Sequence, residues 1–331
     1  MKKDSIFVFL NRLIGKSATS RLYSRLKYVL DLKRYYSDGS TDGCVSGVVV
    51  YMIDGRVRHG GLSDRLRGLM TAYDYCKRSG RKLKINWTYP FKLEDYLHPN
   101  PDGPDWLIAP DEISYSKRDT DVRCLAGLLR LDSRPDIIDK VMDSDKAQIH
   151  YYSNNILDKT EMYARWFKEL FVVDERIAEA VARCKAAMNN EPYVSVTLRF
   201  QSLLGDFFEG EYPVIGDDKE REELIDRCTA AVLKVQSDNP GKKVLVTSDS
   251  RKFLDHISKY EGVYVIDGDL VHMDYTNGGD YMTNMKSFVD MLMLMDADVL
   301  YGYHTGKMYE SSGFFYTSAL FGGKEAVFLS D

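Results

Sequence analysis

The sequence predicts an α/β protein in which two doubly wound domains, each a mostly parallel sheet between helices, follow a basic helical leader. Its 331 residues correspond to about two domains of roughly 150 residues each. With 44% hydrophobic and 29% charged residues, the composition is that of a globular protein. Short uncharged segments rich in β-branched residues alternate with helical patterns, most clearly over 192–331.

Residues 1–34 form the basic leader. Nine basic residues stand there against Asp4 and Asp31, so the segment carries +7 and the rest of the chain −12 of a net −5. Apolar residues lie between the charges at near-helical spacing, and two interpretations are open: a helix on an anionic membrane surface, or a helix that packs on the body of the protein. The apolar run ends at Arg12, too early to span a bilayer, and no cleavage site follows it. We therefore expect a cytoplasmic protein, peripheral on the inner membrane under the first interpretation.

The net charge of −5 argues against a nucleic-acid-binding protein, which needs a basic surface. Five cysteines without a CxxC pair and six scattered histidines predict neither a disulfide framework nor a metal centre. We expect no bound metal and no cofactor.

The first domain is predicted to span 41–185, after a leader and Ser/Gly/Asp linker over 1–40. The uncharged segment 44–53 has the pattern of a strand buried on both faces, and a helix ending at Gly80 and a strand at 81–87 complete a βαβ unit. Further helical patterns cover 121–130, 135–143 and 156–170, and a domain junction is predicted near 174–192.

The second domain is predicted to span 186–331. Strands are expected at 193–200, 243–249, 263–267, 298–303 and 326–329, and helices at 218–237, 250–260, 280–296 and 311–321. Two such domains in tandem predict a cleft faced by the carboxyl ends of both sheets, where ligands of open parallel sheets bind.

The first candidate site is HGGLSDRLRG at 59–68. Gly60 and Gly61 allow close approach of a ligand to the backbone, and the helix that follows offers free N–H groups to an anion. Asp64 is a candidate general base, and Arg65, with Arg67, is placed to meet phosphates. The alternative is a capped turn whose charges face solvent.

The second candidate is Arg199, at the end of the apolar strand 193–200. Burying an arginine there requires an anionic partner, and its planar fork suits a diphosphate; a structural salt bridge is the alternative. Asp206 is expected to hold that arginine or to orient an acceptor hydroxyl.

Two further candidates lie where later strands end and helices begin. The first comprises Ser248, Asp249 and Ser250, which would form hydrogen bonds to a nucleoside, or simply cap a helix. The second comprises Ser311, Ser312, Gly313 and Phe314, where a helix N-terminus beside Lys307 would bind a phosphate. Lys286 and Asp290, four apart on a Met-rich helix, either point toward a cleft or form a surface pair.

In this order, the four segments resemble motifs of the fucosyltransferase superfamily, which includes α-1,2-, α-1,6- and protein-O-fucosyltransferases. HGGLSDRLRG resembles its Gly-rich loop, VSVTLRF its His-x-Arg strand, VLVTSDS its nucleoside segment and SSGFFYTSALFGG its phosphate segment. The resemblance implies a GT-B-like fold of two Rossmann-like domains, GDP-fucose as donor, a glycan or lipid-linked glycan hydroxyl as acceptor, inversion and no metal. Arg199 would then bind the donor's diphosphate.

Three positions depart from these motifs. Thr197 stands where the superfamily has histidine, Phe200 replaces a second basic residue, and Phe315 replaces a second serine. These changes put the identity of the donor in doubt and indicate a divergent bacterial branch. Two alternatives stay open: a transferase of polysaccharide synthesis that uses another nucleotide sugar or moves pyruvyl groups, and a non-catalytic nucleotide- or glycan-binding protein.

Overall fold

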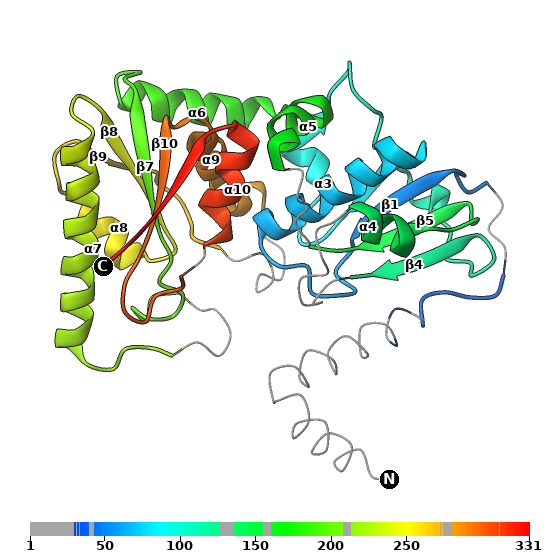
Figure 1. Ribbon diagram of the computed structural model, residues 1–331, viewed down its shortest axis with the longest axis horizontal. Coiled ribbons are helices and arrows are strands. Elements are labelled where there is room, and N and C mark those ends of the chain that lie inside the picture. Colours follow the sequence, from blue (N-terminus) through cyan, green and yellow to red (C-terminus); the bar gives the residue numbers. More distant parts are fainter. Residues whose placement is uncertain are drawn as a thin grey trace, which may run out of the picture. The chain divides into compact units, whose positions relative to one another are not determined.

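A computed structural model describes residues 30, 32, 34–39, 43–125, 135–154, 160–207, 213–271, 273, 280–310 and 312–331. The chain forms two compact units, which Figure 1 shows. Unit 1 comprises Met1–Tyr89 and Pro99–Asp158, and unit 2 comprises Pro90–His98 and Lys159–Asp331. This division differs from the predicted boundary between residues 185 and 186, because helix α6 (Glu175–Ala187), which covers the expected junction, packs on a helix of unit 2, α9 (Tyr281–Asp296).

Unit 1 is built on a four-stranded parallel sheet in the order β2-β1-β5-β4. All six residues of β1 are buried, which explains why this strand carries no charge. The strands are β1 (Val48–Ile53), β2 (Lys82–Trp87), β4 (Thr120–Cys124) and β5 (Gln148–Tyr152), with helices α3 (Leu62–Ser79) and α4 (Pro135–Met142).

The two faces of this sheet are covered differently. On one face the Tyr51 hydroxyl donates a 2.6 Å hydrogen bond to the carbonyl of Arg65 in α3. On the other face Val50 and Met52 share a hydrophobic cluster with Leu32, which is 2% exposed. The end of the basic leader therefore packs on the body of the protein, while the rest of the leader lies outside the described residues.

The prediction of a helix at 121–130 is wrong for residues 121–124. Thr120–Cys124 is strand β4, which pairs in parallel with β5; residues 126–130 lie outside the described part of the chain. The apolar spacing of this segment resembled a helix, but pairing with β5 decided its conformation. Strand β5 itself escaped prediction because Gln148 and His150 interrupt its apolar residues.

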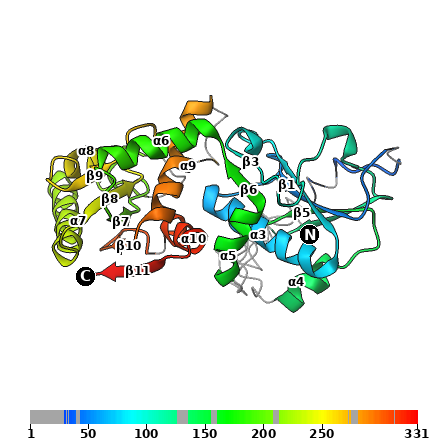
Figure 2. The ribbon, with the colours of Figure 1, turned by 90° about the horizontal axis from the view of Figure 1, so that it is seen from above.

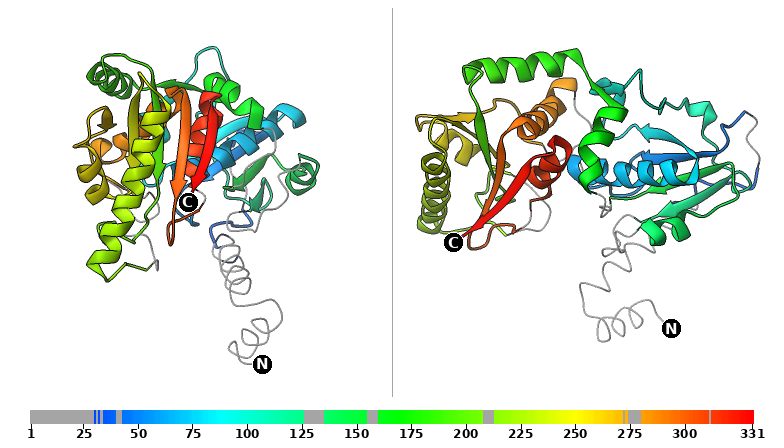
Figure 3. Two further views of the ribbon diagram at one scale, coloured as in Figure 1. Left: turned by 60° about the vertical axis from the view of Figure 1, so that its left-hand side comes forward. Right: turned by 45° about the horizontal axis from the view of Figure 1, so that its top comes forward.

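Unit 2 is built on a five-stranded parallel sheet in the order β11-β10-β7-β8-β9, and the doubly wound fold predicted for this part is confirmed. Its strands are β7 (Tyr193–Leu198), β8 (Lys243–Ser248), β9 (Val263–Val265), β10 (Val299–His304) and β11 (Glu325–Ser330). Its helices include α5 (Tyr163–Leu170), α7 (Asp218–Asp238), α8 (Arg251–Ile257) and α10 (Gly313–Gly322). Figure 3 shows β11, in red, running beside β10 to the C-terminus.

Helices cover both faces of this sheet, as seen from above in Figure 2. Val194 and Val196 of β7 share a core cluster with residues of α7 and α8. On the opposite face the Tyr193 hydroxyl donates to the carbonyl of Met293 in α9 at 2.6 Å. Alternate residues of one strand thus face two helix layers, as the two-residue period of a strand requires.

Helix α10 lies against β10 at a glycine. A Cβ atom on Gly302 would stand 2.2 Å from the ring of Phe315, which is itself 1% exposed. Phe315, where the superfamily's motif has serine, is thus a core residue. Its ring occupies the space that a side chain at position 302 would fill.

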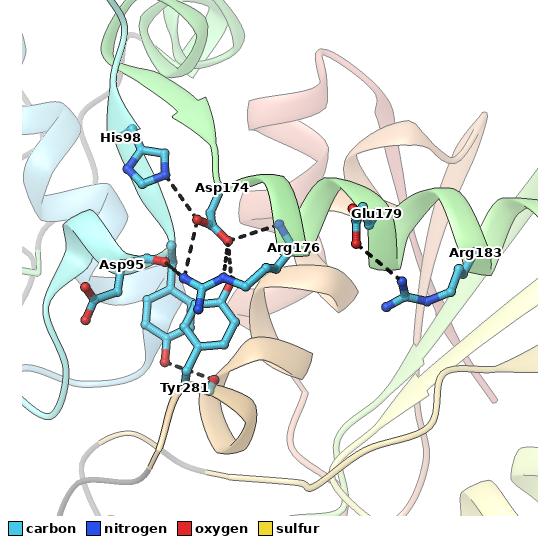
Figure 4. A network of polar contacts seen from close by, with 8 residues as sticks. Asp95, His98, Asp174, Arg176, Glu179, Arg183 and Tyr281 are labelled. Atoms are coloured by element: carbon cyan, nitrogen blue, oxygen red, sulfur yellow. Dashed lines mark hydrogen bonds and ion pairs between the residues drawn. The ribbon is translucent and has the colours of Figure 1, made fainter.

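A polar clasp fixes the short segment 90–98 within unit 2 (Figure 4). The Asp174 carboxylate, at the N-cap of α6, accepts hydrogen bonds from the Tyr281 hydroxyl at 2.7 Å, Arg176 Nε at 2.9 Å and His98 Nε2 at 3.2 Å. Tyr281 stacks in turn on Tyr96 with ring centroids 4.7 Å apart. The clasp joins His98, within β3 (Leu97–Pro99), to the starts of α6 and α9.

Candidate functional site

The switch point of the unit 2 sheet lies between β7 and β10. From β7 the chain proceeds to β8 on one side, whereas β10 and β11 lie on the other side. Ligands of doubly wound sheets bind at the carboxyl ends of the two strands that border such a point. Arg199 directly follows β7, and Thr305 directly follows β10.

Arg199 is held by an acidic partner, as an arginine at this edge requires. Its Nη1 atom lies 3.3 Å from Oδ2 of Asp249, which directly follows β8, and the side chain is 24% exposed. One side of the planar guanidinium is thereby fixed while part of it stays at the surface. An arginine in this state can donate two parallel hydrogen bonds to a phosphate.

Asp249 also shapes the loop after β7. Its two carboxylate oxygens accept hydrogen bonds of 2.8 Å from the backbone N–H groups of Phe200 and Gln201. Gln201 has a φ of 56°, a conformation that non-glycine residues rarely adopt. Burial raises the pKa of Asp249 to about 6, although Arg199 and the two N–H groups lower it.

The other polar residues of these two loops join them together. The Ser250 hydroxyl, at the N-cap of α8, donates to Asp206 at 2.9 Å, and the backbone N–H of Lys252 donates to the same carboxylate at 2.7 Å. Ser248 Oγ accepts from the N–H of Ser250 at 3.1 Å. Ser248, Ser250 and Asp206 thus position the loops, and the acidic residue found beside Arg199 is Asp249.

The N-terminus of α10 is the second part of this edge. Ser312 is its N-cap and makes no side-chain capping hydrogen bond, and Gly313 and Phe314 open the helix. Ser311, predicted with them, lies outside the described residues. The first N–H groups of a helix have no partner within the helix and attract anions.

Lys286 and Asp290 form a buried ion pair on α9. Their Nζ and Oδ2 atoms are 2.6 Å apart, and the two side chains are 5% and 11% exposed. The Lys286 stem lies against Gly268, in the loop after β9, where a Cβ atom would approach it to 3.1 Å. The interpretation as a surface pair is therefore wrong, and the pair offers a donor and an acceptor within unit 2.

The departures from the superfamily's strand motif have local explanations. Thr197 is buried and shares a 2.7 Å hydrogen bond with Thr247 of β8. Phe200 is fully buried and packs on Phe253 of α8, with ring centroids 5.1 Å apart. Both positions therefore contribute to the core.

In unit 1, the glycine loop after β1 forms a helix cap. Gly60 has a φ of 79°, and a Cβ atom there would lie 2.5 Å from the Asp64 carboxylate. That carboxylate accepts from the N–H of Gly61 at 3.2 Å and pairs with Arg67. Asp64 thus occupies the acidic position of a capping box at the start of α3.

Arg65 supports this loop from inside. It is fully buried, and its Nε and Nη1 donate to the carbonyls of Gly60 at 2.8 Å and Tyr89 at 2.6 Å. An enclosed guanidinium that holds two backbone carbonyls is a positioning group. The structure therefore does not support the direct phosphate contact expected of Arg65.

A second polar group at this edge was missed by sequence reasoning. Asp54 directly follows β1, and its carboxylate accepts from the Tyr152 hydroxyl at 2.9 Å and from the N–H of Arg56 at 3.1 Å. Arg56 Nη1 lies 3.5 Å from Oδ2 of Asp54. The strand-end rule that selected Arg199 also selects Asp54, although the stronger local pattern is the Gly-Gly pair that begins six residues further on.

Among the described residues, no group of three or more histidine, cysteine or acidic side chains is arranged to hold a metal ion. In the same part of the chain, no helix has the length and apolar character needed to cross a membrane.

The chain matches no protein-family model and no curated protein sequence. It is similar to the solved structure of a point mutant of Arabidopsis thaliana FUT1 in complex with GDP, with a TM-score of 0.57 and 15% identity over 98% of this chain and 78% of that chain. It is also similar to NodZ α-1,6-fucosyltransferase soaked with GDP-fucose, with a TM-score of 0.52 and 16% identity over 83% of this chain and 92% of that chain. A further NodZ structure, from Bradyrhizobium, gives a TM-score of 0.52 and 16% identity over 82% and 92% of the two chains. The chain therefore has the fold of these fucosyltransferases, which confirms at the level of the fold the resemblance that its motifs indicate.

Proposed function

We propose that this protein is a glycosyltransferase that moves fucose from GDP-fucose to a hydroxyl group of a bacterial surface glycan, with inversion at the anomeric carbon and without a metal ion. The observation that carries the proposal is Arg199, which Asp249 fixes at the switch point of unit 2. Solved structures with the same fold hold GDP or were soaked with GDP-fucose.

The reaction is a single displacement. The acceptor oxygen forms a bond to the anomeric carbon while the bond from that carbon to the β-phosphate oxygen breaks, and the electron pair leaves with GDP. Negative charge therefore builds on the diphosphate in the transition state. The Arg199 fork and the N–H groups that open α10 are suited to stabilise that charge without a metal.

The buried Lys286–Asp290 pair supports a guanine nucleotide as donor. Guanine presents an O6 acceptor and an N2 donor. An ammonium and a carboxylate fixed 2.6 Å apart beside the loop after β9 can donate to O6 and accept from N2. We therefore include this pair in the proposed donor site.

The acceptor side of the proposal rests on unit 1 and on the leader. Two carboxylates lie between the end of β1 and the first turn of α3, Asp54 and Asp64, of which Asp64 is the one that the sequence suggested as general base. The leader's charge of +7 suits an anionic membrane surface. We propose that it holds the enzyme at the cytoplasmic face of the inner membrane, where lipid-linked glycans would be the acceptors.

A panel of nucleotide sugars tests the donor. We expect release of GDP from GDP-fucose, with no comparable release of nucleotide from UDP- or ADP-sugars, and an equal rate in excess EDTA. GDP that stabilises the fold without any turnover of GDP-fucose, with every acceptor glycan offered, would favour a non-catalytic nucleotide-binding protein; saturation at 100 times Kd raises the free energy of unfolding by about 2.7 kcal/mol. Faster turnover of another sugar nucleotide would favour the rival transferase.

Arg199→Ala tests the site itself. Removing one preorganised, positively charged hydrogen-bond donor is expected to lower kcat/KM about 100- to 1000-fold, while the melting temperature stays close to that of the wild type. Arg199→Lys keeps the charge without the fork and is expected to recover only part of the loss. The matched control is Arg183→Ala on the exposed face of α6 (Figure 4), where the guanidinium forms only a weak, exposed pair with Glu179. An Arg199→Ala enzyme with more than a tenth of the wild-type kcat/KM would contradict the assignment.

A further inference from the structure

Gln201, in the loop after β7, adopts a backbone conformation that residues other than glycine rarely take. Its φ is 56°, and four residues later in the same loop Gly205 has a φ of 74°. The other described non-glycine residues with positive φ are Asn189 and Asn190, which are exposed in the turn after α6. Asparagine tolerates this conformation better than glutamine does. Gln201 therefore occupies a position where glycine or asparagine would fold at a lower cost in free energy.

The surroundings of Gln201 enforce its conformation. Its backbone N–H donates to Oδ2 of Asp249 at 2.8 Å, and the N–H of Phe200 donates to Oδ1 of the same carboxylate at 2.8 Å. The Phe200 ring is fully buried and packs on Phe253. The chain just before Gln201 is thus fixed by its backbone and by its side chain. Backbone strain that the surroundings maintain in this way is typical of binding sites.

The carboxamide of Gln201 is buried without a hydrogen bond. The residue is 6% exposed, and its side chain has no hydrogen-bond partner among the described residues, since its bond to Asp249 comes from the backbone. An amide that leaves water without a partner loses free energy, which a hydrogen bond to a ligand would recover. Neither the fold of the loop nor the packing around it accounts for a polar side chain at this position.

Gln201 lies beside the proposed diphosphate site. It comes two residues after Arg199, so the Cα atoms of the two residues are at most about 7.6 Å apart. In a sugar nucleotide the diphosphate joins two rings, the ribose and the transferred sugar. Phosphate oxygens only accept hydrogen bonds, whereas ring hydroxyls both donate and accept. A carboxamide, with an acceptor oxygen and a donor NH2 group, therefore suits a ring hydroxyl.

We propose that the Gln201 carboxamide binds a hydroxyl group of one of the two rings that flank the diphosphate of the donor, an inference that rests on the glycosyl transfer proposed above. The amide oxygen accepts from this hydroxyl, or the NH2 group donates to it. Gln201 is then a donor-binding residue that lies wholly within unit 2. Asp249 positions it through the backbone, as it positions Arg199 through the guanidinium.

Two variants separate the side chain of Gln201 from its backbone. Gln201→Asn keeps a carboxamide and accepts a positive φ, but it is one methylene group shorter and should lose the contact; Gln201→Gly removes the side chain. For both variants we expect calorimetric titration to show a Kd for GDP-fucose about 3- to 10-fold above that of the wild type. The melting temperature should rise or stay within about 2 °C of the wild-type value, because either residue relieves the strain.

Asn189→Gly is the matched control. It makes the same change of backbone preference at a φ of 60°, but in an exposed turn. We expect its Kd for GDP-fucose to equal that of the wild type. A loss of affinity confined to the Gln201 variants would therefore come from the loop after β7 and not from the relief of strain in general.

Titration with GDP identifies the ring, because GDP keeps the ribose and lacks the transferred sugar. Equal weakening of GDP and GDP-fucose binding in Gln201→Asn places the contact on the ribose. Weakening of GDP-fucose binding alone places it on the transferred sugar. Both results support the inference.

The outcomes separate this inference from the proposed function. A wild-type protein that does not turn over GDP-fucose overturns the proposed function. Normal wild-type turnover, together with a Kd for GDP-fucose in Gln201→Asn less than twofold above the wild-type value, overturns the role of Gln201 whatever the melting temperatures. Should Gln201→Gly fail to fold, Gln201→Asn decides by the same criterion.

Discussion

Asp249 shows how one buried carboxylate connects fold and chemistry. It accepts hydrogen bonds from the backbone of Phe200 and Gln201, in the loop after β7. It also contacts the guanidinium of Arg199, the first residue of that loop. A change in the charge of Asp249 therefore reaches Arg199 directly, without any rearrangement of the sheet.

The affinity for GDP-fucose should accordingly fall on acidification. Since the pKa of Asp249 is raised to about 6, the residue becomes neutral below this pH and no longer holds Arg199 by charge. As the pH falls from about 6 to about 4, protonation of Asp249 raises the free energy of unfolding. A raised pKa means that the folded state takes up the proton more readily than the unfolded chain.

Calorimetric titration with GDP-fucose between pH 5 and pH 8 measures this effect. Both phosphates of GDP-fucose are esterified, so the ligand itself does not take up a proton near pH 6. We expect a rising Kd below about pH 6 while the circular dichroism spectrum stays constant, and no such rise in Asp249→Asn, which binds weakly at every pH. An unchanged Kd at pH 5 would show that Asp249 keeps its charge.

Residues at strand ends were predictable to different degrees. Arg199 stood out because a charge that ends an apolar strand requires a partner, and the structure provides one in Asp249. Asp54 follows the same rule but was not predicted. Its hydrogen-bond partner, Tyr152, lies almost a hundred residues further along the chain. The burial of Arg65 was not predictable either, because its partners are backbone carbonyls, which leave no mark on the sequence.

At the scale of elements, the clasp at Asp174 determines how α6 begins. Its carboxylate caps the helix and receives hydrogen bonds from Tyr281, Arg176 and His98. These partners, with those hydrogen bonds, hold the pKa of Asp174 well below its usual range. Elements far apart in the sequence thus depend on one carboxylate.

Asp174→Ala is expected to lower the free energy of unfolding by about 2–4 kcal/mol, through the lost cap and the unpaired partners. The stabilisation from a lowered pKa is complete above the unfolded value of about 3.9 and is lost gradually as the pH falls toward the folded pKa, so the difference from wild type should begin to shrink below about pH 4. Urea unfolding at pH 7 and pH 3.5 measures both effects. Glu179→Ala, in an exposed pair on the same helix, should change stability by less than about 0.5 kcal/mol and serves as control.

Elements with a strong period were the predictable ones. The strands of the five-stranded sheet and helices α7 and α9 lie within a few residues of their expected positions, because burial on one or both faces sets their pattern. Strands β4 and β5 were missed, since their polar residues are satisfied inside unit 1: His150 Nε2 contacts Gln148 at 3.0 Å, and burial lowers the pKa of His150 to about 3. Such pairing is a property of the fold that local sequence does not reveal.

At the scale of the whole molecule, the leader and the residues that directly follow it divide into two parts with different consequences. Leu32 and Tyr36 are buried in unit 1, with exposed fractions of 2% and 5%. The charge that suits a membrane belongs mainly to the residues before them.

Two truncations separate these roles. Removing residues 1–29 should release the protein from anionic liposomes and leave transfer to a water-soluble acceptor unchanged. Removing residues 1–38 should in addition lower the melting temperature, because burying a side chain such as Leu32 contributes about 1.5–3 kcal/mol. Flotation with liposomes and thermal unfolding measure the two effects, and equal liposome binding by the 1–29 truncation and the full chain would exclude the membrane role.

The short segment Pro90–His98 has a practical consequence for recombining this protein with its structural relatives. It belongs to unit 2, although unit 1 sequence flanks it on both sides, and Tyr96 lies stacked between Tyr281 and Phe288 with ring centroids 4.7 and 4.5 Å away. A chimera made with a single crossover at 158/159 would therefore give unit 2 a foreign insert in place of Tyr96. Exchanging unit 1 while keeping unit 2 intact requires three crossovers, so that this nonapeptide travels with the C-terminal half.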